Sequence, residues 1–267
     1  MRDSAASGSE KLKARKPERL VGESRVPLHV GIIPDGNRRY ARENGITKAE
    51  GHALGAERME DLLEWSLDLG IEYVTAYAFS TENFKRPDEE KEALMRIYSE
   101  KFREIAREER IHENEVRVRA IGRKSLFPPG VKNAIREAEE ATGGYDRFHL
   151  TIGIGYGGRA EIVDAARKLC RRVMEGDLSV DEIDEEEVGF AMYLPSLPDV
   201  DLVIRTSGEK RLSGFLLWHA SGSKLHFVDK YWPEFGKEDF LNAVSEWQRS
   251  SRPHKRKDKP KNRLSPT

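Results

Sequence analysis

The feature that most constrains the fold is the regular alternation of short apolar runs with longer segments that repeat apolar residues at helical spacing. The short runs predict strands at residues 28–33, 71–79, 116–121, 148–154, 202–205 and 225–228. The longer segments predict helices at residues 53–69, 88–112, 159–175, 185–192 and 238–247, with a further helix after Pro129. Strands that alternate with helices of this length are joined by crossover connections. The pattern therefore predicts an α/β fold with a central, mostly parallel sheet flanked by helices.

The length of 267 residues permits one large α/β domain or two small ones. Because residues 26–249 show no internal repeat and no linker, we expect this range to form a single domain. The sequence contains no apolar run of the roughly 18 residues that a membrane span needs, and its polar N-terminus does not resemble a secretory signal. A single cysteine, Cys170, excludes an internal disulfide framework and is expected to pack in the core. These features predict a cytoplasmic protein.

Charge is distributed unevenly along the chain, although the net charge is only -1. From Arg249 onward, eight lysines and arginines stand against one acid, Asp258. Residues 1–25 and 250–267 hold too few apolar residues to pack, so we expect both to be disordered basic tails. Such a tail either keeps the protein soluble or makes a peripheral contact with an anionic membrane. We expect no nucleic acid partner.

The most informative dozen residues are 29–40, which read HVGIIPDGNRRY. A buried-strand run stops at Pro34 and is followed by Asp35, a glycine, an amide and two arginines. In a parallel sheet, ligands bind beyond the carboxyl ends of strands. A carboxylate beside two guanidinium groups at that point suits a phosphate ester bound with Mg²⁺. Because Asp35 ends a strand beside a glycine, we expect its loss to affect turnover and to leave folding intact.

Similar polar loops follow three other predicted strands: residues 80–87 (STENFKRP), 155–159 (GYGGR) and 205–213 (RTSGEKRLS). These loops emerge at the same edge of a parallel sheet as Asp35, so they can converge on one cleft. Arginines at positions 39, 86, 205 and 211 would be sufficient for two diphosphate groups. The GYGGR glycines do not complete a dinucleotide-binding motif, so we expect no such cofactor.

Several segments together resemble, in order and spacing, the motifs of cis-prenyltransferases, the undecaprenyl diphosphate synthase family. They are HVGIIPDGNRRYA, EGHALGA, YAFSTENFKRP, GYGGRAEI, DLVIRTSGEKRLSGFLLW and YWPEF, which extend from about Leu28 to Trp247. Pro34 and Tyr40 are closer to archaeal members than to bacterial ones. The resemblance implies a homodimer with a hydrophobic tunnel. It also implies an Mg²⁺-dependent enzyme that joins isopentenyl diphosphate to an allylic prenyl diphosphate, giving the cis-polyprenyl precursor of a glycosyl-carrier lipid.

The resemblance also assigns roles to individual residues. Asp35 would be the metal ligand and central catalytic acid, and Asn83 lies where the family's proposed proton acceptor lies. Since a neutral amide is a poor base, we expect Asn83 to orient diphosphate or water instead. The allylic substrate would be bound by Gly36, Asn37, Arg38, Arg39, Tyr40, Lys48 and His52. Ser80, Thr81, Glu82, Phe84 and Arg86 would complete that region, and Arg205, Arg211, Leu212 and Ser213 match the isopentenyl diphosphate site.

One departure from the family pattern matters most, because Lys224 stands where the second acidic metal ligand normally lies, and Gly214 stands nearby where asparagine is usual. Three arrangements are open: Asp35 and diphosphate hold the metal alone, Lys224 neutralises diphosphate, or Asp229 substitutes for the missing acid. The departure also keeps open a variant enzyme with an altered acceptor or an irregular condensation. A non-catalytic subunit that binds prenyl diphosphate is the third interpretation.

Overall fold

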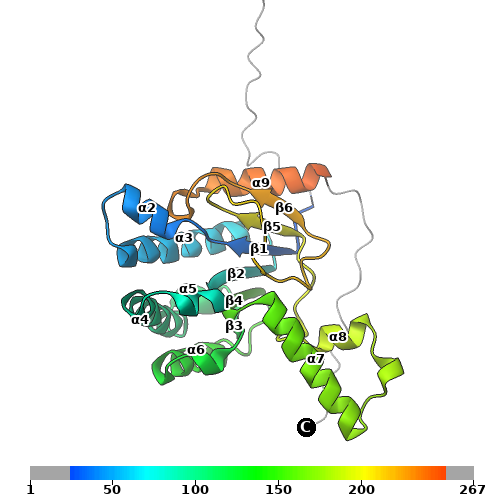
Figure 1. The fold of residues 1–267 in the computed structure, drawn as a ribbon. Coiled ribbons are helices and arrows are strands. Elements are labelled where there is room, and N and C mark those ends of the chain that lie inside the picture. The colour runs from blue at the N-terminus through cyan, green and yellow to red at the C-terminus, as the bar shows by residue number, and fades with distance from the viewer. Residues whose placement is uncertain (1–24, 251–267) are drawn as a thin grey trace, which may run out of the picture.

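The structure is a computed structural model that describes residues 25–250. The predicted disorder of the two basic tails falls on residues 1–24 and 251–267, outside the described range. Within residues 25–250, six strands form one sheet in the order β3-β4-β2-β1-β5-β6, and every pairing is parallel (Figure 1). The strands are β1 (His29–Ile33), β2 (Tyr73–Ser80), β3 (Val116–Ile121), β4 (Phe148–Tyr156), β5 (Leu202–Arg205) and β6 (Lys224–Phe227). The predicted α/β class with a parallel sheet is confirmed.

Helices and short helical turns connect the strands. The helices are α2 (Asn37–Glu43), α3 (Lys48–Asp68), α4 (Asp88–Ile105), α5 (Glu109–Glu113), α6 (Pro129–Ala141), α7 (Gly158–Glu175), α8 (Glu185–Ala191) and α9 (Lys237–Ser250). The short turns are η1 (Thr81–Lys85), η2 (Lys124–Leu126), η3 (Val180–Glu182) and η4 (Trp232–Glu234). None of the helices within residues 25–250 is long and apolar enough to cross a membrane.

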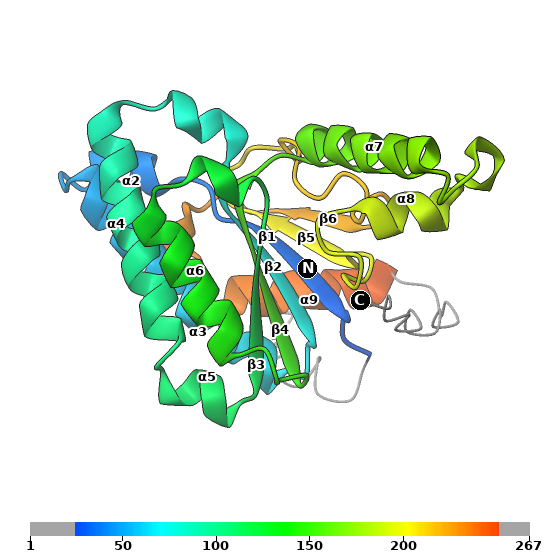
Figure 2. The same cartoon turned by 90° about the horizontal axis from the view of Figure 1, so that it is seen from below.

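Side-chain alternation along the strands builds a separate apolar core on each face of the sheet. Ile32 and Ile204 point to the first face, where they share a core with residues of α3, α4, α6 and α9. Ile33 and Val203 point to the second face and pack with Phe215 and its neighbours. Helices α7 and α8 bury a third, smaller cluster between them and project to one side of the molecule (Figure 2).

Several predicted boundaries differ from the structure for local reasons. Helix α3 begins at Lys48, five residues earlier than predicted, because Thr47 and Glu50 form a capping box at its N-terminus. The predicted helix at 88–112 is two helices separated by a turn at residues 106–108. Cys170 is exposed, so the prediction that it packs in the core is wrong. The buried residues of α7 are Gly158, Glu161, Ala165 and Leu169, which recur every three or four positions, and Cys170 lies off that stripe.

The fold brings the carboxyl ends of β1, β2, β4 and β5 to one edge of the sheet. Asp35 follows β1, the η1 turn follows β2, α7 follows β4, and Thr206 follows β5. The loops therefore converge at this edge of the parallel sheet, as predicted.

Candidate active site

Asp35 is held by both its backbone and its side chain. Its N–H donates to Thr206 Oγ1 at 2.9 Å, and that hydroxyl donates to the Asp35 carbonyl oxygen at 2.6 Å. The carboxylate accepts from Arg205 Nη2 at 2.8 Å and from Arg39 Nη2 at 3.3 Å. Burial alone would raise the pKa of Asp35, but the hydrogen bond and charge of Arg205, with the charge of Arg39, hold that pKa below its ordinary value. Asp35 is therefore a carboxylate at neutral pH.

Gly36 allows α2 to begin immediately after Asp35. Its φ of 107° lies in the left-handed region, and a Cβ there would come within 2.7 Å of the Tyr231 ring. The same Tyr231 ring lies 5.5 Å from the Arg39 guanidinium carbon, in a cation–π contact. Arg39 also donates to the Ser207 hydroxyl. These contacts tie the start of α2 to the loop after β5.

Arg205, the last residue of β5, is a fixed cation with a side chain only 5% exposed. Besides Asp35, its guanidinium bonds the carbonyl oxygen of Arg211 and Ser213 Oγ, the latter at 2.7 Å. The loop that supplies these partners is strained, because Ser207 and Ser213 have φ values of 75° and 49°. In contrast, the Arg211 side chain is 62% exposed and pairs with Glu209. The loop therefore offers one rigid and one adjustable guanidinium.

The η1 turn positions Asn83. The Ser80 N–H donates to Asn83 Oδ1 at 3.0 Å, so the amide oxygen is engaged by the turn itself. This geometry agrees with an orienting role better than with proton removal. Phe84 packs against Phe79 and Phe127, with ring centroids 4.9 and 5.3 Å away. Phe84 thus belongs to the core behind the turn.

A second acid, Glu90 of α4, gathers four basic side chains. Its carboxylate lies 3.0 Å from Arg86 Nη1, 3.5 Å from Arg38 Nε, 3.5 Å from Lys48 Nζ and 3.8 Å from His52 Nε2. The Glu90 side chain is only 5% exposed. We call these five residues the Glu90 cluster. Sequence reasoning selected all four basic members and missed the acid, although Arg86 and Glu90 have the i,i+4 spacing of a helical ion pair.

Three buried polar atoms in this region have no hydrogen-bond partner among the described residues: Asn37 Oδ1, His52 Nε2 and Glu90 Oε2. Unsatisfied buried polar groups are uncommon and often mark a ligand site. Burial, and then repulsion by Arg86, lowers the pKa of His52 to about 4, so His52 is neutral at pH 7. The region is thus prepared to accept further hydrogen bonds.

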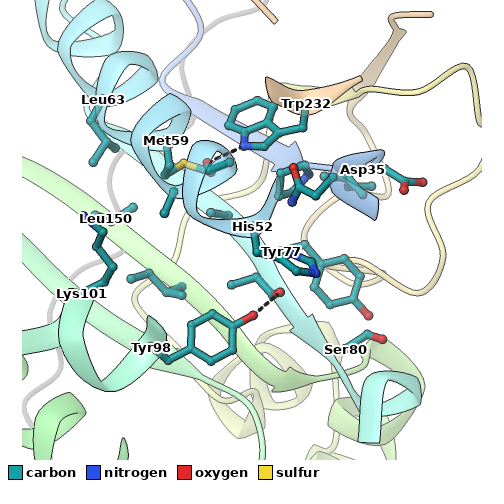
Figure 3. Close-up of a pocket in the computed structure, with 18 of the residues that line it drawn as sticks. Asp35, His52, Met59, Leu63, Tyr77, Ser80, Tyr98, Lys101, Leu150 and Trp232 are labelled. Atoms are coloured by element: carbon teal, nitrogen blue, oxygen red, sulfur yellow. Dashed lines mark hydrogen bonds between the residues drawn. The ribbon is translucent and has the colours of Figure 1, made fainter. Parts of the chain in front are cut away.

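A cavity of about 1210 Å³ is lined by Asn37 and His52 and extends from them into an apolar interior. This exceeds the usual size of a small-molecule site, roughly 300–1,000 Å³. Figure 3 shows Asp35 and His52 at one part of its wall, with Met59 and Leu63 of α3 and Leu150 of β4 farther along. Tyr98 donates to the Ala78 carbonyl at 2.8 Å, and Trp232 Nε1 donates to that of Gly55 at 2.7 Å. The apolar lining consists mainly of Ala56, Met59, Leu63, Leu94, Ile97, Tyr98, Phe102, Leu150 and Ile152.

Many of the predicted site residues line this cavity. They are Asp35, Asn37, His52, Ser80, Thr81, Glu82, Asn83, Arg86, Arg205, Arg211 and Ser213. The others are not part of its wall: Gly36, Arg38, Arg39, Tyr40, Lys48, Phe84 and Leu212. Leu212 packs on the core of the second sheet face. Arg159 at the start of α7 also lines the cavity, a cation that sequence reasoning left out of the site.

Lys224 does not stand beside Asp35 within this chain. Lys224 pairs with Leu202 at the beginning of β5, and Arg205 lies three residues farther along. At about 3.3 Å per residue, Lys224 is roughly 10 Å from the level of the site. It is exposed and is not part of the cavity wall, so the geometry of a single chain does not support the arrangement in which Lys224 neutralises diphosphate. Asp229 is closer, because a Cβ on Gly208 would lie 3.2 Å from its Oδ1.

The site can hold Mg²⁺ only with help from a ligand. Within residues 25–250, no group of three or more His, Cys, Asp or Glu side chains could hold a metal ion. Mg²⁺ nevertheless binds readily to one or two carboxylates together with substrate phosphates and water. The half-buried, ionised Asp35, with 31% of its side chain exposed at the cavity, fits that requirement. The donor set therefore suits a metal that arrives with a diphosphate.

Comparison with known sequences places the chain in a defined group. A family model described as "Putative undecaprenyl diphosphate synthase" matches residues 33–255. A relative from Methanopyrus kandleri, named tritrans,polycis-undecaprenyl-diphosphate synthase (geranylgeranyl-diphosphate specific), is 53% identical over 91% of this chain and 89% of its own. A relative of the same name from Methanocaldococcus jannaschii is 48% identical over 92% of this chain and 89% of its own.

Solved structures agree in fold. Lavandulyl diphosphate synthase from Lavandula x intermedia, solved with dimethylallyl diphosphate, matches with a TM-score of 0.80 and 35% identity. The match covers 85% of this chain and 97% of the plant protein. A probable undecaprenyl diphosphate synthase from Campylobacter jejuni matches with a TM-score of 0.70 and 32% identity, covering 86% of this chain and 98% of the bacterial one.

Proposed function

Because the chain belongs to the undecaprenyl diphosphate synthase family of cis-prenyltransferases, it is a prenyltransferase that elongates prenyl diphosphates, and we propose geranylgeranyl diphosphate as its primer. Isopentenyl diphosphate would be the unit added, and the product would be a cis-polyprenyl diphosphate that serves as the precursor of a glycosyl-carrier lipid. The observation that carries this proposal is one continuous cavity with cations and Asp35 at one part and an apolar interior beyond. The primer is suggested by the printed specificity of the archaeal relatives.

The allylic diphosphate would lie at the start of α2, near Asn37, Arg39 and the Glu90 cluster. Its departure from the allylic carbon requires that negative charge be neutralised as it develops, which fixed guanidinium groups do well. Asp35 and the diphosphate oxygens would hold Mg²⁺, which supplies further neutralisation of the leaving group when bound. The prenyl tail would then extend along the apolar wall formed by α3, α4 and β4.

The isopentenyl diphosphate would lie at the loop after β5, where Arg205, Arg211 and Ser213 converge. Arg205 already holds Ser213 Oγ and Asp35, so it couples the acceptor subsite to the metal-binding carboxylate. Arg211 is exposed and can turn toward a second diphosphate. Asn83 would orient the acceptor from the opposite loop, since its amide oxygen is already bonded within the turn.

We propose a homodimer assembled through the β6 edge of the sheet. β6 is an edge strand, and Leu225 within it is 45% exposed. An exposed edge with an apolar side chain is normally covered by another chain or element. Multi-angle light scattering on the full chain should give a dimer, and Leu225→Lys should shift it toward monomer. A monomeric wild-type protein at assay concentration would contradict the proposed dimer.

The basic C-terminal segment would bring the enzyme to an anionic membrane, where a long prenyl product belongs. Each cation near such a surface contributes up to about 1 kcal/mol, screened by salt. Deletion of residues 251–267 should lower binding to anionic liposomes at low salt and should change turnover in detergent little. Equal liposome binding by both proteins would leave the segment as a solubilising tail.

Labelled isopentenyl diphosphate provides the direct test of the function. The full chain is incubated with Mg²⁺ and with geranylgeranyl, farnesyl or dimethylallyl diphosphate, and products are separated by reversed-phase chromatography. We expect long cis-polyprenyl products, most efficiently from the geranylgeranyl primer, and none after removal of divalent metal with a chelator. A short irregular product would instead favour an altered acceptor, and absence of turnover with every primer would favour a non-catalytic subunit.

A further inference from the structure

Glu90 is a buried acid beside the cavity, and the proposed chemistry assigns its carboxylate no role of its own. The residue lies in the first turn of α4, and its side chain is buried beneath Arg38, Lys48, His52 and Arg86. A carboxylate is rarely buried to this degree unless it is paired. Here it is paired several times over, and only by side chains from the region proposed to bind the allylic diphosphate.

The partners come from three separate elements. Arg38 belongs to α2, Lys48 and His52 belong to α3, and Arg86 follows η1. Without an anion between them, three permanent cations this close would repel one another and drive the elements apart. Glu90 supplies that anion from within the protein. It therefore keeps the diphosphate-binding groups together when no substrate is present.

The charge balance leaves room for a ligand. His52 is neutral at pH 7, so three cations face one carboxylate and the Glu90 cluster retains an excess of two positive charges. Glu90 engages one nitrogen of each guanidinium, Nε of Arg38 and Nη1 of Arg86. Each guanidinium has five N–H donors, so both can turn remaining donors to a phosphate. Glu90 Oε2 has no hydrogen-bond partner among the described residues, and its contact with Lys48 Nζ is an ion pair at 3.5 Å, so Lys48 can also turn donors to a phosphate.

We propose that Glu90 is an internal substitute for the diphosphate, which competes with it for the same cations and so speeds the release of pyrophosphate. Before substrate binds, Glu90 holds the cations in position. When the diphosphate is bound, the cations divide their donors between it and Glu90. After the prenyl group has been transferred, Glu90 draws the cations back, and the enzyme binds free pyrophosphate less tightly than an uncompensated cluster would. Glu90 is thus a positioning residue, and this inference rests on the function proposed above.

Binding of inorganic pyrophosphate provides the test. Glu90→Gln keeps the shape of the side chain and an acceptor for Arg86 while removing the charge. Coulomb's law at close range and moderate dielectric predicts that loss of one repulsive charge tightens pyrophosphate binding by about tenfold. Isothermal titration calorimetry on the full chain, at fixed Mg²⁺ and ionic strength, measures the effect. Glu89→Gln is the matched control, because it removes the same charge from the exposed neighbouring position and should leave the affinity nearly unchanged.

Stability and kinetic measurements distinguish the proposed role of Glu90 from a merely structural one. The Glu90→Gln variant should melt at a lower temperature than wild type without ligand, and pyrophosphate should raise its melting temperature more. Its first turnover should be preserved better than its steady-state rate, and added pyrophosphate should inhibit it more strongly. If Glu90→Gln does not fold, Glu90→Asp, which draws the carboxylate back by one methylene, should show a smaller tightening in the same direction.

Pyrophosphate affinity that is unchanged or weakened in a folded Glu90→Gln variant overturns the proposal. So does an equal tightening in Glu89→Gln, because the effect would then come from net charge alone. The calorimetric measurement does not depend on catalysis. A wild-type chain without prenyltransferase activity would therefore refute the proposed function while leaving the competition between Glu90 and pyrophosphate measurable.

Discussion

The substitution Asp35→Asn should lower both stability and turnover. Arg205 is 5% exposed, and Asp35 is its carboxylate partner at 2.8 Å. Removing one partner of a buried ion pair costs about 3–5 kcal/mol. The Asp35 side chain is 31% exposed, so solvent offsets part of that cost and we expect about 2 kcal/mol. For a chain of this size, that loss corresponds to a decrease of about 4–8 °C in melting temperature.

Turnover should fall by about a thousandfold, as for loss of a main electrostatic contact in the transition state. Urea denaturation measures the stability and labelled isopentenyl diphosphate measures the turnover. Glu137→Gln is the control, since it removes the acid from an exposed pair with Arg107 and should cost no more than about 0.5 kcal/mol. In the double variant Asp35→Asn with Arg205→Met, part of the lost stability should return, because no unpaired guanidinium remains buried.

Unchanged unfolding free energy in Asp35→Asn would refute this reasoning, because Arg205 would then need no carboxylate partner. Retention of more than a tenth of the activity would refute the central role of Asp35 in turnover. The sequence predicted the loss of activity but not the loss of stability. The loss of stability depends on a strand pairing that places Arg205 opposite Ile33, two residues before Asp35, and no local pattern shows that pairing.

Three further outcomes follow from the site geometry. Burial lowers the pKa of His52 to about 4, whereas an unfolded histidine titrates near 6.5. The unfolded chain therefore binds more protons between these values, and wild-type stability should fall as pH decreases from about 6.5 to 4. Thermal melts across that range should show a smaller change of melting temperature with pH for His52→Gln than for wild type, and an equal change would contradict the assignment. Arg211→Ala should raise the KM for isopentenyl diphosphate about tenfold or more in steady-state kinetics and should leave the KM for the allylic substrate nearly unchanged. The reason is that a charged hydrogen-bond partner is lost at one diphosphate only. Equal changes in both KM values would mean that the subsites are wrongly assigned. Leu63→Trp should shorten the longest product seen by chromatography, because it fills the cavity about 12 Å along α3 from Gly55; an unchanged product would place the prenyl tail elsewhere.

Strand positions were predicted well because a buried strand has a distinctive pattern in its local sequence. The bounds of β3 and β5 match the predicted runs at 116–121 and 202–205 residue for residue. Each run combines β-branched residues with a sharp polar boundary, and this pattern depends little on distant contacts. The break between α4 and α5 was missed because the sequence remains highly charged throughout residues 88–113. In so uniformly charged a segment, the short connection between the two helices does not stand out from the helical residues on either side.

The sequence identified the site residues that belong to a motif and missed those that only the packing of helices brings to the site. Asp35, Asn83 and Arg205 sit at strand ends within recognisable segments. Glu90 sits in the run DEEKE, which looks like an ordinary solvated helix face. It becomes a buried acid only when α2 and α3 pack beside α4, and no one-dimensional pattern reports that contact. Lys224 shows the opposite case, because a motif left open a contact with diphosphate that the register of β5 and β6 does not support within one chain.

Under the proposed function, the arrangement of two carboxylates would let one site bind several diphosphate charges and still release pyrophosphate. Asp35 is bonded to Arg205 and Arg39, while Glu90 is paired with Arg38, Lys48 and Arg86. Each set of cations is therefore held in place by a resident anion, so little reorganisation is needed when substrate arrives. A pocket with only cations would bind pyrophosphate so tightly that its release would limit turnover. Partial neutralisation by the protein weakens the product complex while leaving the groups aligned for the next transfer.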